Sequence, residues 1–113
     1  MSYKIKSAAS FDKDFKRLLK RYVSLPDDLK LLVKELKKNP TMGTSLGHGV
    51  HKIRMAIKSK GGGKSGGARV ITYVNVVIDT EEGSVYLLAM YDKSDQDTIT
   101  DQAIKDLLKQ IPE

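Results

Sequence analysis

ARVITYVNVVI, running from Ala68 to Ile78, decides the fold, because it is rich in β-branched residues and almost continuously apolar. Such a run is typical of a central β-strand. Before it, residues 51–57 (HKIRMAI) alternate apolar with mostly cationic side chains, which predicts a strand with one apolar and one basic side. After it come a polar stretch at residues 79–84, expected to be a turn, and a third apolar run at residues 85–91 (VYLLAMY). The three runs predict an antiparallel meander.

Helical periodicity flanks these strands. Residues 3–7 alternate in polarity and favour a short strand, and apolar residues from Phe11 to Tyr22 then recur on one face of a helix. Leu25-Pro26 suits the first turn of a second helix, which Asn39-Pro40 should end. The tail from about Thr98 again has helical spacing. The sequence therefore predicts an α+β chain.

The chain of 113 residues has room for one compact domain, taken as residues 1–113. It has no cysteine, which excludes disulfides and thiolate metal sites. No apolar run approaches the length of a membrane span, and no signal-peptide-like segment is seen. We expect a soluble cytoplasmic protein with no membrane partner.

Positive charge covers the first two thirds of the chain. Residues 1–40 hold eleven Lys or Arg against five acids, residues 41–78 hold six against none, and residues 79–113 hold three against nine. The middle segment also contains both histidines and eight of the nine glycines. This distribution predicts a phosphate-containing polyanion as the ligand.

Residues 58–67 (KSKGGGKSGG) form a basic glycine-rich segment between two predicted strands. The triplet Gly63-Lys64-Ser65 is found in phosphate-binding P-loops, but Lys58 stands where such a loop needs its first glycine, and a strand follows instead of a helix. We exclude a P-loop and expect a mobile cationic loop that settles on RNA. A disordered hairpin tip is the simpler alternative.

A second set of basic and aromatic residues belongs to the strands. In chain order they are Lys52, Arg54, Lys58, Arg69, Tyr73, Tyr91 and Lys93. In a meander the end of the third strand lies beside the start of the second, so Tyr91 and Lys93 should approach Arg69. Guanidinium groups stabilise charge on a reacting phosphate, and a tyrosine or lysine can take the proton of a 2′-hydroxyl. The tyrosine can instead stack on a base, or be an ordinary sheet-edge residue.

The histidines give a weaker signal. His51 falls on the apolar side of its strand, where a core or edge role is the commoner one. His48 lies in a Gly-His-Gly turn. Two histidines three residues apart, without a neighbouring acid or cysteine, are a poor metal site, so we expect neither a metal nor another cofactor.

At these positions the sequence resembles the RelE/ParE superfamily of type II toxins, particularly its HigB-like branch. The resemblance rests on HKIRMA from His51, a Lys/Gly loop, GGARVITY ending at Tyr73, and YLLAMYDK ending at Lys93. It covers residues 50–95 well and the flanking helices more loosely. Two positions depart from the pattern. Asp95 stands where glutamate is common, and Thr72-Tyr73 replaces paired aromatics, which leaves one ring for stacking.

The resemblance implies a RelE-like fold, with two N-terminal helices packed on a small twisted antiparallel sheet and a C-terminal helix. It implies an endoribonuclease that cuts mRNA in the ribosomal A site by metal-independent 2′-hydroxyl attack. Its partners would be the ribosome, mRNA and a cognate antitoxin, often a helix-turn-helix protein. By position, Arg54 and Arg69 would contact or neutralise phosphate, and Tyr91 and Lys93 would transfer protons or position mRNA. The RNA- and ribosome-binding residues would be Lys52, Lys58, Lys60, Lys64 and Tyr73.

Two other functions remain open at this point. A ParE-like toxin shares the fold but inhibits DNA gyrase without cutting RNA, and an inactive relative would only bind RNA. The presence of Arg69, Tyr91 and Lys93 favours cleavage.

Overall fold

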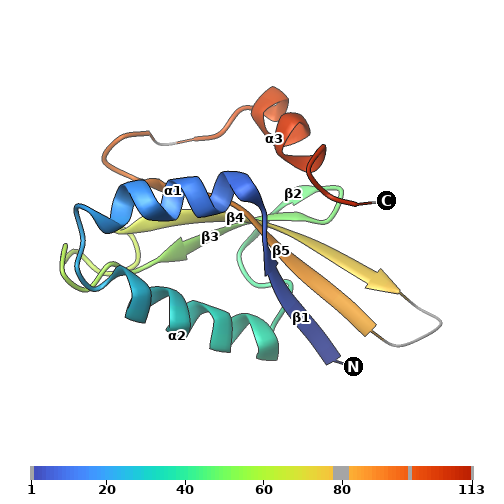
Figure 1. The fold of residues 1–113 in the computed structure, drawn as a ribbon, viewed down its shortest axis with the longest axis horizontal. Helices are drawn as coiled ribbons and strands as arrows, with labels where there is room; N and C mark the ends of the chain where they lie inside the picture. The colour runs from blue at the N-terminus through green and yellow to red at the C-terminus, as the bar shows by residue number, and fades with distance from the viewer. Residues whose placement is uncertain (1, 78–81, 97, 113) are drawn as a thin grey trace.

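The computed structural model describes residues 2–77, 82–96 and 98–112. Its elements follow one another in the order β1 (Ser2–Ser7), α1 (Ala9–Leu19), α2 (Leu25–Lys38), β2 (Thr44–Gly47), β3 (Val50–Met55), β4 (Ala68–Val77), β5 (Glu82–Asp92) and α3 (Asp101–Leu108), as Figure 1 shows. The predicted α+β class is confirmed.

The strands form one five-stranded sheet in the order β1-β5-β4-β3-β2. The predicted meander is confirmed, because β3, β4 and β5 pair antiparallel in sequence. The expectation of a purely antiparallel sheet is wrong at one edge, where β1 runs parallel to β5. The other edge, β2, was not predicted, since its residues are exposed throughout and show no apolar alternation. Of the expected turn at residues 79–84, residues 79–81 lie outside the described residues, as does Ile78, whereas residues 82–84 belong to β5.

The helix boundaries follow the local signals. α2 begins at Leu25-Pro26 and ends at Lys38, where Asn39-Pro40 cannot continue it. α3 begins slightly later than expected, at Asp101, because Thr100 is its N-cap and accepts a hydrogen bond from the backbone N–H of Ala103 at 3.1 Å.

Each face of the sheet has its own apolar cluster. On one face, α1 and α2 pack through Phe11, Leu18, Leu32 and Leu36 against strand residues such as Val70 and Met90. On the other face, α3 contributes Ile104, Leu107 and Leu108, which pack on Val50, Ile71 and Leu88. None of the residues of α3 is fully buried, so this second layer is the thinner one. Figure 1 shows α3 over the half of the sheet that lies away from the β3–β4 loop.

Beyond the end of β1, side chains of α1 form hydrogen bonds with the backbone of β5. The last β1–β5 pair joins Ser7 and Leu87, and beyond it side chains of α1 satisfy the strand backbone. The Ser10 hydroxyl donates to the carbonyl of Leu88 at 2.5 Å, and the Asp14 carboxylate accepts from the N–H of Met90 at 3.0 Å. Burial raises the pKa of Asp14, and that hydrogen bond offsets part of the rise. The end of β5 is thus fixed relative to α1.

Gly67 lies where the β3–β4 loop returns to the sheet. A Cβ atom at this position would lie 2.1 Å from the carbonyl oxygen of Met55 and 3.0 Å from the backbone nitrogen of Ile57. Both neighbours are backbone atoms, so they cannot swing aside as a flexible side chain would. The Gly67 carbonyl also accepts a hydrogen bond from the N–H of Lys93 at 3.1 Å. Glycine is therefore required here by packing.

Replacing Gly67 by alanine should lower the free energy of unfolding by about 2–3 kcal/mol, because the new methyl group forces the loop away from β3. Urea denaturation measures this loss. Ser65→Ala is the matched control in the same loop, since Ser65 is exposed, and it should stay within about 0.5 kcal/mol of the wild type. Equal midpoints for the two variants would contradict the packing argument.

Candidate functional site

Arg54, Arg69 and Tyr91 form a row across three neighbouring strands. Arg54 of β3 is the register partner of Arg69 of β4, and Arg69 is the partner of Tyr91 of β5. Directly paired residues point to the same face of a sheet, and Tyr91 belongs to the apolar cluster on the α3 side. The predicted approach of Tyr91 to Arg69 is confirmed, at the end of the sheet nearest the β3–β4 loop.

The members of the row differ in accessibility. Arg54 is exposed, whereas Arg69 and Tyr91 are each only 5% exposed. Lys93 is exposed and lies immediately beyond the end of β5. A ligand approaching this end of the sheet from solvent therefore meets Arg54 and Lys93 before it meets the two buried side chains.

A cleft of about 370 Å³ opens between α2 and the end of β3, and Arg54 is the member of the row that lines it. Its lining includes three of the predicted cationic site residues, Arg54, Lys58 and Lys64. The α2 wall contributes the acids Asp28 and Glu35, and the Nζ of Lys64 lies 3.9 Å from a Glu35 carboxylate oxygen. Three cations against two acids leave the lining of the cleft with a formal net charge of +1.

The glycine-rich loop, which the sequence analysis expects to be mobile, is anchored by hydrogen bonds at both ends. At its start, the backbone N–H of Lys58 donates to the Asp28 carboxylate at 3.2 Å, and that of Ser59 donates to the Ser24 hydroxyl at 2.8 Å. Both partners lie at the start of α2, so the loop is attached to that helix. The sequence contains these partners, but they are about thirty residues away and leave no local signal.

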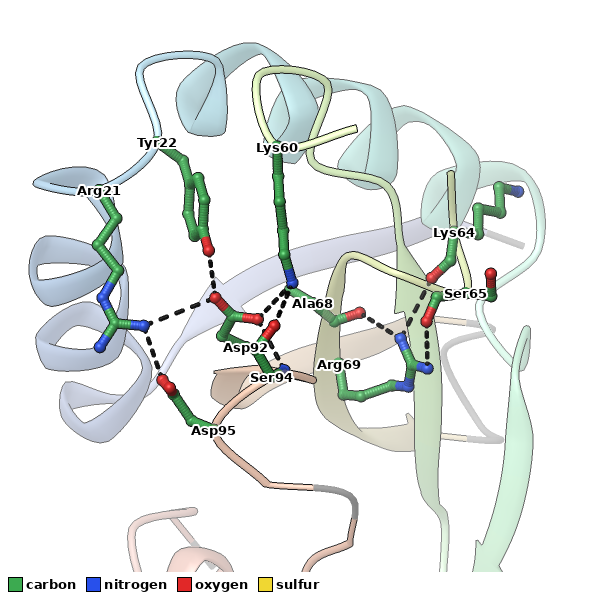
Figure 2. Close-up of polar contacts among 10 residues, drawn as sticks. All are labelled: Arg21, Tyr22, Lys60, Lys64, Ser65, Ala68, Arg69, Asp92, Ser94 and Asp95. Atoms are coloured by element: carbon green, nitrogen blue, oxygen red, sulfur yellow. Dashed lines mark hydrogen bonds and ion pairs between the residues drawn. The ribbon is translucent and has the colours of Figure 1, made fainter. Parts of the chain in front are cut away.

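Arg69 holds the far side of the same loop. One terminal nitrogen of its guanidinium donates to the carbonyls of Lys64 and Ala68, both at 3.2 Å, and the other donates to the carbonyl of Ser65 at 3.0 Å. Figure 2 shows the guanidinium turned toward these loop carbonyls. The sequence predicted a phosphate contact for Arg69, whereas the structure shows these nitrogens bonded to the backbone of the protein.

Asp92, which the sequence analysis did not select, is the centre of a buried polar network. It is 1% exposed, and Figure 2 shows its carboxylate between the end of α1 and the loop. Tyr22 donates a hydrogen bond to one carboxylate oxygen, and the Lys60 ammonium donates to the other at 2.7 Å. Lys60 also donates to the Ser94 hydroxyl at 2.8 Å, and the N–H of Ser94 donates to Asp92 at 2.9 Å.

This network keeps Asp92 ionised. Burial alone would raise the pKa of the Asp92 carboxyl, but the hydrogen bonds from Lys60, Tyr22 and the Ser94 amide outweigh it and hold that pKa well below its usual range. Bonding to Asp92 in turn raises the pKa of the Tyr22 phenol. The Lys60 side chain is 21% exposed, so the predicted RNA-binding ammonium is an internal ion-pair partner in this structure.

Arg21 extends the network to the surface. Its guanidinium lies 3.6 Å from Asp92 and donates to Asp95 at 2.8 Å. Asp95 is the acid that stands in place of the more usual glutamate. Its partner, Arg21, lies just after the end of α1. An acid directly after a continuous apolar strand, in a basic chain, is the sequence signal that could have drawn attention to Asp92.

The remaining predicted residues lie further from the row. Lys52 shares the face of Arg54 and is partly exposed. Tyr73 lies opposite Tyr86, with ring centroids 6.4 Å apart, so the second ring that the Thr72-Tyr73 pair lacks is supplied by the neighbouring strand. The Nζ of Lys6 lies 5.6 Å from the Tyr86 ring centroid. These residues form an aromatic and basic surface along the same face.

The two histidines are separated by the sheet geometry. His51 is 9% exposed and pairs with Thr72, on the face opposite Lys52 and Arg54, as the alternation predicted. His48 is exposed in the β2–β3 turn with a φ of 54°. Within residues 2–77, 82–96 and 98–112, no cluster of three or more His, Cys, Asp or Glu side chains is arranged as a metal site. In the same ranges, no helix has the length and apolarity to span a membrane.

Comparison with known proteins identifies the fold and then the family. The structure of an E. coli RelE toxin, a double arginine-to-alanine mutant in the free state, superimposes with a TM-score of 0.60 at 15% identity, covering 99% of this chain and 100% of that one. At this identity the likeness shows the fold alone. The family model described as the RelE toxin of the RelE/RelB toxin-antitoxin system matches residues 11–111. The chain therefore belongs to the RelE family and is a toxin of a toxin-antitoxin system. Among proteins of curated function, none matches the chain.

Asp92→Asn should lower the free energy of unfolding by about 3 kcal/mol at neutral pH, because it leaves the partly buried Lys60 without its counter-charge. The folded state holds the pKa of Asp92 below its ordinary value of 3.8, so the carboxylate stabilises the fold above that pH, and its contribution is lost as the pH falls below it. The stability difference between wild type and variant should therefore be constant from pH 7 to about 5 and shrink in more acidic solution.

Urea titrations across this pH range measure the difference. Asp95→Asn is the matched control, because it removes the other acid that Arg21 contacts, on an exposed pair. Its cost should not exceed about 1 kcal/mol. A cost for Asp92→Asn as small as that for Asp95→Asn would show that the buried network does not stabilise the fold.

Proposed function

We propose that this RelE-family toxin is a ribosome-dependent endoribonuclease that cuts mRNA in the A site and so stops translation. The observation that carries the proposal is the register row Arg54–Arg69–Tyr91, whose exposed member Arg54 also lines a cleft with Lys58 and Lys64. Two arginines and a phenol in one row, with further lysines near the exposed arginine, suit a ribose-phosphate backbone. Within the family we favour the HigB-like branch, on the motif order of residues 51–56, 66–73 and 86–93.

The proposed reaction is an attack of a 2′-hydroxyl on the adjacent phosphate. The 2′-oxygen forms a bond to phosphorus, the bond to the 5′-oxygen of the next nucleotide breaks, and the products carry a 2′,3′-cyclic phosphate and a 5′-hydroxyl. A base removes the proton of the 2′-hydroxyl and an acid returns one to the leaving oxygen. Tyr91 and Lys93 are the candidates for these two transfers. The protein side chains supply all these groups, so we propose that the reaction needs no metal.

The two arginines of the row take different parts in this scheme. Arg54 is exposed and can place its guanidinium directly against the phosphate, where it stabilises the charge that develops on the oxygens. Arg69 is buried and bonded to loop carbonyls, so its charge acts on the phosphate from behind the surface while its bonds shape the loop. Lys52, Lys58, Lys64 and Tyr73 are left to bind messenger or ribosomal RNA.

The partners follow from the same proposal. The toxin acts in the cytoplasm on translating ribosomes, and a cognate antitoxin, which we expect to be a helix-turn-helix protein, neutralises it. The exposed cations give the surface a positive field that attracts both the ribosome and an acidic antitoxin segment.

Mapping mRNA 5′ ends in a translating extract tests the activity. The wild-type toxin should produce new ends inside codons, and Arg54→Ala should lower the cleavage rate about a hundredfold, as expected for loss of one group that stabilises transition-state charge. Because Arg54 is exposed, the fold should survive the substitution. Lys13→Met is the control, since it removes an exposed lysine of α1, which packs on the face of the sheet opposite the row.

Intact full-length messages with the wild-type toxin would contradict the proposal. If the same extract or expressing cells showed inhibited DNA gyrase with intact mRNA, the ParE-like function would replace it. An Arg54→Ala variant that cuts at the wild-type rate would leave the nuclease function standing and remove Arg54 from the site.

A further inference from the structure

The loop at residues 58–67 closes a ring of contacts around the candidate site. Asp92 directly follows Tyr91 in β5 and binds Lys60 at 2.7 Å. From Lys60 the chain runs through three glycines to Lys64 and Ser65, whose carbonyls accept hydrogen bonds from Arg69. Arg69 is the register partner of Tyr91, which completes the ring. Figure 2 shows its polar contacts in one view.

Side-chain packing does not hold the middle of the ring. The φ angles of Gly61, Gly62 and Gly63 are 80°, 84° and 62°. Glycine adopts such positive φ angles at little cost, but it adopts negative ones as easily, so these residues do not fix the backbone by themselves. A Cβ placed on Gly61 or Gly63 would meet no atom within 4 Å, so packing does not hold these residues. Backbone hydrogen bonds within residues 57–67 shape its turns, and the side-chain bonds at its two ends set where the loop lies relative to the sheet.

The ion pair at the first end is well built for holding the loop. Asp92 is 1% exposed and cannot lower its energy by turning to solvent, and Tyr22 and the Ser94 amide satisfy the oxygens around the Lys60 contact. Removing Lys60 would leave this carboxylate without its closest cation. By contrast, the loop acceptors at the other end are the neutral carbonyls of Lys64 and Ser65, which move with the loop.

We propose that the Lys60–Asp92 ion pair is a positioning device for mRNA cleavage: it fixes the glycine-rich loop and, through the carbonyls of Lys64 and Ser65, places the Arg69 guanidinium opposite Tyr91. Lys60 and Asp92 are positioning residues that touch no substrate. This inference rests on the proposed nuclease function. It also reassigns Lys60, which the sequence predicts to bind RNA.

Single-turnover cleavage on programmed ribosomes, with the toxin varied up to saturation, tests the proposal. Lys60→Met and Asp92→Asn should each lower the rate constant at saturation between about tenfold and a hundredfold, the range expected when a reacting group is displaced by about an ångström. The double variant should be no slower than the slower single variant, because both changes open the same pair. The dependence of half-saturation on salt should stay as in the wild type, since no phosphate contact is lost.

Two further variants separate positioning from loss of fold and from RNA binding. Lys60→Arg keeps the charge and the donors, and it should restore the rate constant to within about threefold of the wild type. Lys64→Met removes a cation whose side chain is 65% exposed, and it should instead raise the half-saturating concentration and flatten its salt dependence. Lys13→Met, the exposed control on α1, should change neither quantity.

Three results would overturn the inference. The first is a Lys60→Met variant that raises half-saturation and flattens its salt dependence while the rate constant at saturation stays unchanged, because that is the signature of an RNA contact. The second is a double variant whose loss is the product of the two single losses, because the residues would then act independently. The third is a Lys60→Arg variant as slow as Lys60→Met.

Amide hydrogen exchange distinguishes failure of the inference from failure of the proposed function. Opening the pair should speed exchange at Lys60, Gly61 and Gly66, whose N–H groups donate within residues 57–66, in Lys60→Met and in Asp92→Asn alike. This readout needs no cleavage, so it supports the loop-fixing role even if the wild-type toxin leaves mRNA intact. Unchanged exchange in both variants would overturn the inference while leaving the nuclease proposal untouched.

Discussion

A carboxylate buried at the end of β5 must be neutralised by neighbouring groups, and the way this chain does so determines the shape of its candidate site. Asp92 takes its partners from three parts of the sequence: Tyr22 and Arg21 at the end of α1, Lys60 in the glycine-rich loop, and Ser94 just beyond the strand. Buried ion pairs often add little net stability compared with an apolar core, but breaking one is costly. Their bonds are directional, so they select one arrangement of the segments that they join.

This constraint divides the positive charges of the protein into two groups. Lys60 and Arg69 are directed inward, the first to a carboxylate and the second to backbone carbonyls. Arg54 and Lys64 remain at the surface around a cleft. Counting cations in the sequence predicts that the ligand is negatively charged, because the inward-directed cations still contribute to the electrostatic field around the protein. Counting does not predict which of them touch the ligand, since that depends on where the buried acid lies.

The sequence predicts those parts of the site that follow from strand periodicity. Alternation along β3 and an antiparallel meander suffice to place Arg54, Arg69 and Tyr91 in one row, and they also place His51 on the opposite face. The parallel pairing of β1 with β5 could not be predicted in the same way, because the five alternating residues 3–7 fit either edge of the sheet and either direction. The Asp92 network was missed for a related reason: Tyr22 and Lys60 lie 70 and 32 residues from their partner, and neither leaves a local pattern.

The loop illustrates why the residues that break local rules lie beside the candidate site. A run of glycines between two strands loses more backbone entropy on ordering than any other sequence of that length, and taken alone it indicates disorder. Yet only glycine readily takes the positive φ angles that let this segment turn and direct the carbonyls of Lys64 and Ser65 toward Arg69. The cost of ordering is therefore offset at the ends, by the Lys60–Asp92 pair and by the bonds to Ser24 and Asp28. A sequence that is locally unfavourable becomes ordered because its partners are already fixed by α1, α2 and β5.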